Sequence, residues 1–340
     1  MEKVRFGIGG CGNIGARHAR NLNEGKVENG VLSAVCDINP AKLDAFRELY
    51  GDKIKYFATA EEMYKSSECD CVIIAVPHYD HPSLAMLALD EELHCVVEKP
   101  AGVYTLQVEE MIERSKKSDK ILGIMFNQRT NPAFKKMREM IKDGKIGEIK
   151  RTNWIITDWY RTQAYYNSGG WRATWIGEGG GVLLNQSPHQ LDLWQWICGM
   201  PVKVQAHLQY GKWHDIEVED DVTAYVEYEN GATGVFVTST GDAHGTNRFE
   251  IQMDKAKFVV ENNKLTMLEY NMSEPEFTKT NKKAFGAPRA KKIRVKTDRK
   301  NLQHVGVLNA WAKTILGEGR LVADGREGPN GLILSNAMHL

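Results

Sequence analysis

The sequence of 340 residues predicts an α/β protein in which a doubly wound parallel sheet is followed by an α+β domain built on an open-faced, mainly antiparallel sheet. Three observations predict this architecture. Short apolar runs alternate with helical patterns over residues 1–126, which is typical of a parallel sheet covered by helices. Residues 127–340 show alternating strand patterns and a hairpin signal instead. The length is about twice that of a typical domain, so we expect two domains, 1–126 and 127–340.

The first domain shows a regular alternation of strands and helices. Its predicted strands are Val4–Ile8, Val31–Cys36, Cys71–Val76, His94–Glu98 and Ile121–Phe126. Its predicted helices are Gly15–Asn23, Pro40–Tyr50, His81–Glu91 and Thr105–Lys117. The run Cys71–Val76 is apolar throughout, as expected for a strand that is buried on both faces.

The second domain changes to mainly antiparallel patterns. Its predicted helices are Ala133–Lys142 and Gly181–Cys198, and its predicted strands are Ile149–Thr157, Val222–Tyr228, Ala232–Thr238, Phe249–Met253, Lys257–Glu261 and Lys264–Tyr270. Asn230-Gly231 is a strong turn signal and predicts a hairpin. The basic stretch Lys282–Lys300 predicts a solvated loop and an edge strand rather than a binding surface. Residues 335–340 have the pattern of a helix interior without a stop signal, so we expect the native chain to continue.

The composition argues against several classes of partner. The 44 basic and 44 acidic residues give a formal net charge of zero, which argues against a nucleic-acid partner. The 6 cysteines form no CxxC pair and predict free thiols in the reducing cytoplasm. No apolar run approaches the ~20 residues of a membrane span, so no membrane partner is expected. No signal peptide and no metal site are expected either.

Residues 10–15 (GCGNIG) form a GxGxxG motif directly between a predicted strand and a predicted helix. In this context the first glycine makes a tight turn, the second lets backbone N–H groups approach a pyrophosphate, and the third allows close packing of helix on strand. The helix N-terminus attracts the anion. The expected dinucleotide-binding residues are therefore Gly10, Gly12, Asn13, Ile14 and Gly15. The alternatives are a purely connecting glycine turn and a site for S-adenosylmethionine in a methyltransferase.

Asp37 indicates which dinucleotide is bound. It lies 22 residues after Gly15, at the end of the second predicted strand. A carboxylate there can accept hydrogen bonds from the adenosine ribose hydroxyls and would repel a 2′-phosphate. Ile38 and Asn39 follow, and neither is an arginine that would neutralise such a phosphate. The sequence therefore predicts NAD rather than NADP.

Glu98-Lys99-Pro100 lies at the end of a predicted strand, where open α/β sheets bind their ligands. A lysine there can hydrogen-bond a substrate oxygen through its ammonium group. This tripeptide belongs to an ordered set of motifs: the GxGxxG, Ala75-Val76-Pro77 with His81, residues 179–189 (GGGVLLNQSPH) and the Asn230-Gly231-Ala232 turn. With this set the chain resembles, over almost its whole length, the Gfo/Idh/MocA family of oxidoreductases, the relatives of glucose–fructose oxidoreductase and inositol dehydrogenase.

The resemblance implies a Rossmann domain followed by an open-sheet domain, with the active site between them. It implies that Lys99 is a catalytic lysine and that the proline after it is often cis. The family's second catalytic element, an Asp-x-x-x-His pair, falls on Asn185 and His189, so an asparagine replaces the usual aspartate. Asparagine cannot take up a proton or hold a negative charge, so it can only position the substrate or His189. The residues that the resemblance adds to the cofactor site are Pro77, His81, Glu98, Lys99 and Asn127.

These residue types suit the oxidation of an alcohol, in which a hydride leaves carbon and a proton leaves oxygen. Residues i and i+4 share one face of a helix, so Asn185 and His189 can address one hydroxyl if their segment is helical. Histidine titrates near neutrality and suits the proton step. The ammonium of Lys99 would stabilise the developing alkoxide. The alternative for His189 is a core histidine satisfied by a backbone carbonyl.

Residues 154–175 contain seven aromatic side chains, namely Trp154, Trp159, Tyr160, Tyr165, Tyr166, Trp171 and Trp175, with Arg161 and Arg172 among them. Aromatic faces stack on the apolar faces of sugar rings, so the cluster favours a carbohydrate or glycoside substrate. The predicted substrate-binding residues, some of them implied by the resemblance, are Lys99, Arg129, Trp159, Trp171, Arg172, Asn185 and His189. A place in the core or in a subunit interface is the alternative for any single aromatic residue.

The sequence thus predicts an NAD-dependent oxidoreductase that transfers a hydride between the nicotinamide and a ring hydroxyl or ketone of a sugar, glycoside or polyol. Two alternatives stay open: an NAD-using glycosidase that acts by transient oxidation and elimination, and a non-catalytic NAD or sugar sensor on the same fold. The resemblance also implies a homodimer or homotetramer built through the open sheet.

Overall fold

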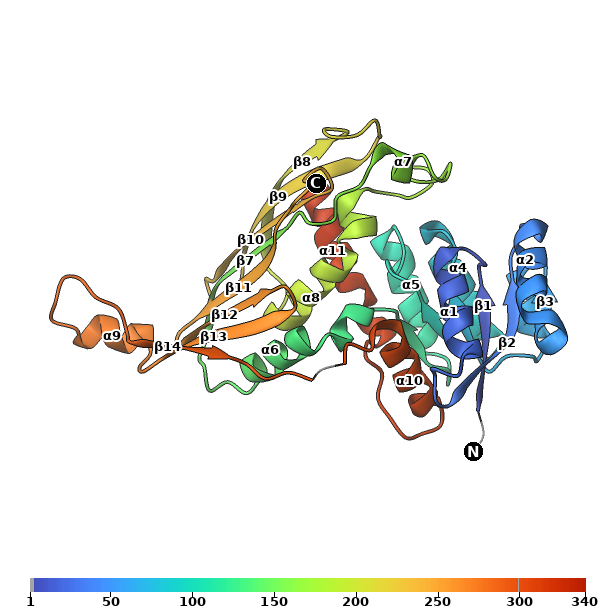
Figure 1. Ribbon diagram of the computed structural model, residues 1–340, viewed down its shortest axis with the longest axis horizontal. Coiled ribbons are helices and arrows are strands. Elements are labelled where there is room, and N and C mark those ends of the chain that lie inside the picture. The colour runs from blue at the N-terminus through green and yellow to red at the C-terminus, as the bar shows by residue number, and fades with distance from the viewer. Residues whose placement is uncertain (1–2, 299) are drawn as a thin grey trace. The chain divides into compact units, whose positions relative to one another are not determined.

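The computed structural model describes residues 3–298 and 300–340, which form two compact units (Figure 1). The first unit contains the chain up to Thr130 together with residues 177–179 and Leu302–Ile333. The second contains Asn131–Ile176, Gly180–Asn301 and Leu334–Leu340. Each unit has its own sheet and its own hydrophobic core.

The first unit is built on a six-stranded sheet with the strand order β3-β2-β1-β4-β5-β6. Its strands are β1 (Val4–Gly9), β2 (Gly30–Cys36), β3 (Lys55–Phe57), β4 (Cys71–Ile74), β5 (His94–Val97) and β6 (Leu122–Ile124). Every pair of neighbours in the sheet is parallel. The order reverses between β1 and β4, so the predicted doubly wound parallel sheet is confirmed.

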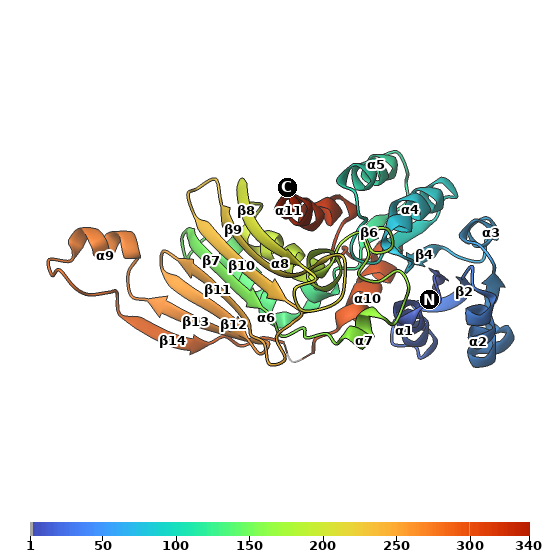
Figure 2. The same ribbon diagram turned by 90° about the horizontal axis from the view of Figure 1, so that it is seen from above.

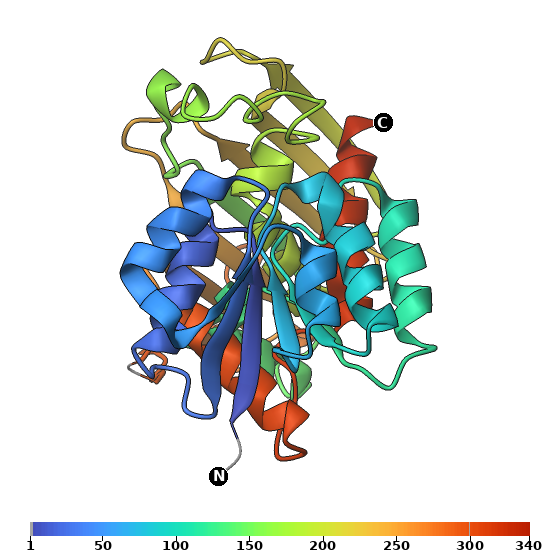
Figure 3. The same ribbon diagram turned by 90° about the vertical axis from the view of Figure 1, so that its right-hand side faces the viewer.

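Helices flank both faces of this sheet (Figure 3). The longer ones are α1 (Asn13–Asn23), α2 (Pro40–Tyr50), α3 (Ala60–Lys65), α4 (His81–Asp90), α5 (Thr105–Ser115) and α10 (Gln303–Ile315), and the short turns are η1 (Gly51–Lys53), η2 (His78–Asp80), η3 (Asn127–Thr130) and η5 (Gly325–Glu327). Local signals start several of them. The side chain of Asn39 caps α2, and Thr59 forms a capping box with Glu62 at the start of α3.

Helix α10 belongs to the first unit although it follows the second sheet in the sequence. Val307, Leu308 and Trp311 are fully buried in the same hydrophobic cluster as Phe6 of β1. A Cβ atom on Gly123 of β6 would lie only 2.6 Å from the indole of Trp311, so this glycine makes room for the helix. The first unit is therefore not one continuous stretch of chain that ends at residue 126, because residues 302–333 also belong to it.

The second unit is built on an eight-stranded sheet with the order β14-β13-β12-β11-β7-β10-β9-β8. Its strands are β7 (Ile149–Ile156), β8 (Lys203–Tyr210), β9 (Glu219–Glu227), β10 (Thr233–Ser239), β11 (Asn247–Met253), β12 (Ala256–Glu261), β13 (Lys264–Tyr270) and β14 (Ala290–Arg294). The pair β7–β10 is parallel and the other pairs are antiparallel. The predicted open, mainly antiparallel sheet is confirmed.

Helices α6 (Pro132–Lys142) and α8 (Pro188–Cys198) cover one face of this sheet (Figures 1 and 2). The strands alternate accordingly: on β11, Phe249 and Ile251 are fully buried in the core, whereas Glu250 and Gln252 lie on the opposite face. The remaining helices are α7 (Gln163–Tyr166), the π-helix η4 (Val182–Gln186), α9 (Glu274–Thr280) and α11 (Gly328–His339), which ends in this unit.

Several expectations for the second sheet are confirmed. Strands β9 and β10 form the hairpin around Asn230-Gly231, and Gly231 adopts a φ of 81° that favours glycine. Strand β14 is the edge strand expected within Lys282–Lys300. The short strand β3, helix α3 and the edge strand β8 were not predicted.

Two chain-wide properties are also visible. All six cysteines are free. Among the helices of residues 3–298 and 300–340, none combines the length and the hydropathy that crossing a membrane requires.

Candidate functional site

The glycine motif forms a tight turn between β1 and α1 in the first unit. Gly10 has a φ of 98°, and its N–H donates to the carbonyl of Cys36 at 2.9 Å. A Cβ atom on Gly10 would lie 2.4 Å from the carbonyl oxygen of Ala75, and one on Gly15 would lie 1.9 Å from that of Gly10. Both positions therefore exclude any side chain, as the motif requires.

Gly12 differs from the other two glycines because a Cβ atom there would meet nothing within 4 Å. It caps α1 without a side-chain hydrogen bond, and the first turn of α1, which includes Asn13 and Ile14, contains no acidic residue. The open space at Gly12 lies beside a helix N-terminus, whose first N–H groups can bind an anion such as a pyrophosphate. The turn thus fits the pyrophosphate of NAD.

Asp37 lies beside this turn at the end of β2. Its carboxylate accepts the N–H of Cys11 at 2.8 Å and the N–H of Asn39 at 2.8 Å, and the ammonium of Lys42 lies 3.4 Å away. The carboxylate is therefore fixed next to the glycine turn, as a group that recognises the adenosine ribose must be. The next side chain, Ile38, is 90% exposed and adds no charge.

The carboxyl end of β4 completes this edge of the sheet. The chain after β4 contacts Gly10 through Ala75 and continues through Pro77, which is exposed, into η2. His81 is buried, with Nδ1 2.7 Å from the carbonyl oxygen of Pro100 and Nε2 3.0 Å from that of Val76. Burial lowers the pKa of His81. This imidazole ties the loop after β4 to the loop after β5.

Lys99 follows β5 and is half-buried, and its peptide bond to Pro100 is cis. Glu98 is buried, and its carboxylate accepts the N–H of Lys99 at 3.2 Å and contacts Nε2 of His18 at 2.7 Å. Burial raises the pKa of Glu98, but the hydrogen bond and charge of His18, with contributions from His304 and Lys99, outweigh burial and lower it to about 2. Glu98 is therefore an anion at neutral pH, and it is hydrogen-bonded to the backbone N–H of Lys99.

Residues after β6 meet the start of α10. The amide Nδ2 of Asn127 donates to Oε1 of Gln303 and lies 3.5 Å from Nδ1 of His304. The Oδ1 atom of Asn127 is buried without a hydrogen-bond partner among the described residues, which leaves an acceptor for a ligand or a water. Arg129, in contrast, is fully buried and pairs with Glu327 at 2.7 Å, so its charge is already balanced within the protein.

In the second unit, Asn185 lies in the π-helix η4 and His189 lies in the first turn of α8. The break falls at Ser187, whose N–H bonds to the carbonyl of Val182. The segment is helical as expected, but it is not one regular α-helix, so the usual i, i+4 spacing does not by itself place Asn185 and His189 on one face. Asn185 is half-buried and His189 is buried.

A buried carboxylate fixes the start of this segment. Glu219 of β9 is inaccessible to solvent and accepts the N–H of Gly181 at 2.9 Å and that of Leu183 at 2.9 Å. A Cβ atom on Gly181 would lie 2.0 Å from the backbone oxygen of Glu219, so the two segments touch directly. Nε2 of His339, in α11, lies 3.7 Å from Oε2 of the same carboxylate. Glu219 therefore positions η4 and with it Asn185.

The aromatic segment divides into core and accessible residues. Trp154 is fully buried in the core of the second unit, whereas Trp159 and Trp171 are partly accessible. Arg172 lies over the ring of Trp171, with Cζ 4.6 Å from the centroid, and Arg161 lies over that of Trp159 at 5.7 Å. The predicted substrate residues of this segment therefore form one accessible cluster of guanidinium and aromatic groups.

Four polar residues next to these positions were missed by the sequence reasoning. His18 contacts the carboxylate of Glu98, and His304 acts on it electrostatically. Gln303 accepts a hydrogen bond from Asn127, and Glu219 accepts backbone N–H groups at the start of η4. His18 lies three residues after the last glycine of the motif, on the helix that the motif begins, which is the one local signal available. The other three lie far along the chain from the residues that they hold.

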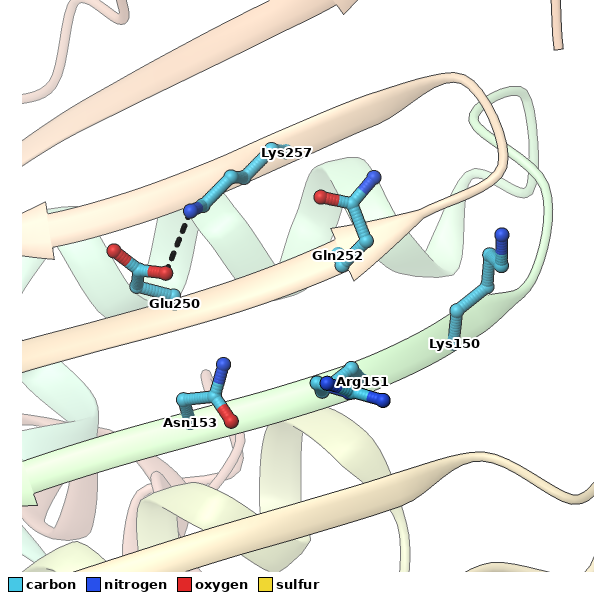
Figure 4. A pocket seen from close by; sticks show the side chains of 6 residues that line it. All are labelled: Lys150, Arg151, Asn153, Glu250, Gln252 and Lys257. Atoms are coloured by element: carbon cyan, nitrogen blue, oxygen red, sulfur yellow. Dashed lines mark ion pairs between the residues drawn. The ribbon is translucent and has the colours of Figure 1, made fainter. Parts of the chain in front are cut away.

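A shallow depression lies elsewhere, on the face of the second sheet that α6 and α8 do not cover (Figure 4). Its volume is about 370 Å³, and Lys150, Arg151, Asn153, Glu250, Gln252 and Lys257 line it. Glu250 pairs with Lys257 at 2.6 Å and with Arg248 at 2.6 Å. None of the predicted site residues lines this depression, and Lys150, which does line it, pairs with Glu274 outside it.

Comparison with protein families covers both units. Residues 4–126 match the model of an oxidoreductase family with an NAD-binding Rossmann fold. Residues 134–259 match the model of the GFO/IDH/MocA C-terminal domain.

Individual proteins give the same relationship. The chain is 27% identical over 267 residues to myo-inositol 2-dehydrogenase of Thermotoga maritima, covering 76% of this chain and 75% of that protein. It is 28% identical over 219 residues to D-glucoside 3-dehydrogenase of Escherichia coli, covering 59% and 60%. The crystal structure of the WlbA dehydrogenase from Chromobacterium violaceum, in complex with NADH and UDP-GlcNAcA, is similar with a TM-score of 0.85 and 28% identity, covering 100% of this chain and 93% of that one.

Proposed function

The chain belongs to the GFO/IDH/MocA family of NAD-binding oxidoreductases, and we propose that it is a dehydrogenase acting on a ring hydroxyl or ketone of a sugar, glycoside or polyol. The observation that supports this proposal most is that a glycine turn that fits NAD follows β1 while Lys99 follows β5, at the same edge of one parallel sheet with only β4 between them. The relatives named as dehydrogenases of inositol and of D-glucosides support the substrate class.

We assign NAD to the edge of the first sheet formed by the carboxyl ends of β1, β2 and β4. The backbone at Gly12 would bind the pyrophosphate, and Asp37 would bind the adenosine ribose. Asn127 supplies a buried acceptor near the loop that carries Lys99. When bound, NAD supplies a hydride acceptor or, in its reduced form, a hydride donor.

We propose that Lys99 and His189 serve a single reaction. The ammonium of Lys99 would donate a hydrogen bond to the substrate oxygen and stabilise it as it loses its proton. The imidazole of His189 would accept that proton, because histidine titrates near neutrality. In the reverse direction His189 returns the proton to the alkoxide.

Asn185 changes the roles within this site relative to an Asp–His pair. Its amide can donate and accept hydrogen bonds but cannot exchange a proton at neutral pH. We therefore assign proton transfer to His189 and assign Asn185 to orientation of the substrate or of the imidazole. Glu219 acts on this step indirectly by holding the helix η4.

The test is a screen of polyols, sugars and glycosides with NAD, followed by the absorbance of reduced nicotinamide. Inositols, aldohexoses and methyl glycosides cover the ring hydroxyls in question. Formation of NADH in proportion to oxidised substrate supports the proposal. Release of free sugar from a glycoside without net NADH would instead identify the eliminating glycosidase. Binding of NAD and sugars without turnover of any kind would identify a sensor.

We also propose that the protein works in the cytoplasm as a homodimer or homotetramer. The six free cysteines support a reducing compartment. The sheet face of the second unit that the helices leave open supports assembly through that face. Sedimentation equilibrium would measure the oligomer, and a monomer at micromolar concentration would contradict this part of the proposal.

A further inference from the structure

Two guanidinium groups pack against a single tyrosine ring in the second unit. The Cζ atom of Arg161 lies 4.9 Å from the ring centroid of Tyr165, and that of Arg172 lies 4.8 Å from it. Each arginine also lies over a tryptophan, as described above. Stacking on aromatic faces holds a planar guanidinium in place while its N–H groups remain able to donate at its edge.

The hydroxyl of Tyr165 is arranged to donate a hydrogen bond. Its oxygen accepts Nη1 of Arg172 at 3.0 Å and Nε2 of Gln186 at 3.1 Å. Both neighbours are donors, so the phenolic hydrogen is left to bind an acceptor outside this group. Gln186 lies in η4 directly after Asn185, which connects the hydroxyl to the segment that we assign to the substrate.

Arg161 carries a positive charge beside this tyrosine. Acidic residues contact the segment at other points: Asp215 bonds to Gln163 through its backbone, and the carboxylate of Glu217 accepts the N–H of Trp175. Among residues 3–298 and 300–340, no carboxylate lies within ion-pair distance of Arg161, and its Nε atom is buried without a hydrogen-bond partner. A buried donor without a partner is unfavourable, so an acceptor that reaches this Nε atom would bind there with a gain.

We propose that Arg161, Tyr165 and Arg172 form a subsite for an anionic group of the substrate, either a carboxylate or a phosphate. The inference rests on the proposed dehydrogenase function and narrows its substrate class to acidic sugar derivatives. Guanidinium groups suit both anions because their paired N–H groups match two oxygens of a carboxylate or phosphate. The amide at position 185 suits the same class, since a carboxylate there would repel the ligand.

The first experiment measures binding by calorimetry to the full chain saturated with NADH. The matched probes are D-glucuronate with D-glucose, and methyl β-D-glucuronide with methyl β-D-glucoside. Glucose 1-phosphate and UDP-glucose test the phosphate as a monoester and as a diphosphate esterified at both ends. The anionic member of at least one pair is expected to bind about tenfold or more tightly than its neutral partner. The preferred probe then tells a carboxylate from a phosphate.

The second experiment compares variants with the preferred anionic probe and its neutral partner. Arg161→Gln is expected to weaken binding of the anion about tenfold and to leave the neutral sugar within about twofold. Arg161→Lys keeps the charge and is expected to recover part of the loss. The control is Arg289→Gln, which removes one positive charge from an exposed loop of the same unit and is expected to change neither affinity.

Two results would overturn the subsite. One is equal affinity for the anionic and the neutral member of every pair. The other is an Arg161→Gln variant that loses both affinities equally, as a folding defect would cause. Either result leaves the dehydrogenase proposal standing if NADH still forms with neutral sugars. Conversely, selective binding of an anion without any turnover supports the subsite and contradicts the dehydrogenase.

Discussion

Nε2 of His18, on the helix that begins at the glycine turn, lies 2.7 Å from Oε1 of Glu98, the residue before Lys99. Both side chains are buried, so this contact joins the expected cofactor turn to the expected catalytic strand end inside one unit. A buried carboxylate keeps its charge only if it is well hydrogen-bonded, and His18 and the N–H of Lys99 supply those bonds. Glu98 therefore supports the loop that presents Lys99.

Glu98→Gln should destabilise the protein by about 3 kcal/mol, because it leaves His18 without its charged partner in a buried site. Thermal or chemical unfolding of the wild type and of Glu98→Gln measures the difference in their free energies of unfolding. The control is Glu61→Gln, which breaks an exposed i, i+4 pair with Lys65 and should change stability by less than about 0.5 kcal/mol. Similar small effects of both substitutions would show that the His18 contact contributes little.

His304 should make stability depend on pH in the acidic range. Burial lowers the pKa of His304 to about 4, although Glu98 attracts its proton. The unfolded chain has a histidine pKa of about 6.5, so between these values the unfolded state binds a proton that the folded state does not. Stability should therefore fall as pH drops from about 6.5 to 4, by about 2–3 kcal/mol from this residue. His304→Gln should remove that part of the slope in urea unfolding, and an unchanged slope would contradict it.

Glu219→Gln should impair turnover without impairing cofactor binding. The amide replaces one of two oxygens that accept the N–H groups of Gly181 and Leu183, so η4 loses a fixed position. We expect kcat to fall about tenfold or more, while NADH affinity stays within about twofold. The control is Glu227→Gln on the same strand, whose carboxylate pairs with Lys203 at the surface. Loss of NADH affinity in parallel with kcat would indicate general unfolding instead of positioning.

Asp37→Asn should relax the preference for NAD. The substitution removes the charge that repels a 2′-phosphate and weakens the bonds to the ribose hydroxyls. The ratio of NAD to NADP affinity should fall about tenfold or more, measured by titration with both cofactors. Asp44→Asn, on the exposed side of α2, serves as the control and should leave the ratio unchanged. A ratio that also stays constant in Asp37→Asn would contradict the assignment of the ribose to this carboxylate.

Local patterns allowed most of the fold to be predicted. The glycine turn, the apolar strand β4 and the Asn230-Gly231 hairpin are each marked by a pattern that spans only a few consecutive residues. Strand β3 has only three residues, none of them buried, so it shows no clear apolar pattern. Strand β8 does alternate, with Val204, Ala206 and Leu208 packed against the core, so its sequence carries a signal that the prediction did not use. The return of α10 to the first sheet has no local signal, because it depends on packing of Trp311 against Gly123.

The candidate site divides in the same way. Lys99, Asp37 and the glycines occur in recognisable spacings, whereas Glu219 lies 38 residues after Gly181 and meets it only through the fold. The helix carrying Asn185 was expected, but its π-turn was not, because no residue pattern marks where the register changes. Partners that hold a site from a distance are therefore visible only in the structure.

The central claim is that Lys99 acts on the substrate oxygen while the first unit binds NAD independently of it. The most direct measurement compares Lys99→Ala with the wild type, using the substrate that the screen identifies and NADH titration in parallel. We predict that kcat/KM falls about 100-fold or more while NADH affinity stays within about twofold, and that Lys116→Ala, at an exposed position, changes neither. Wild-type turnover in Lys99→Ala would contradict the account.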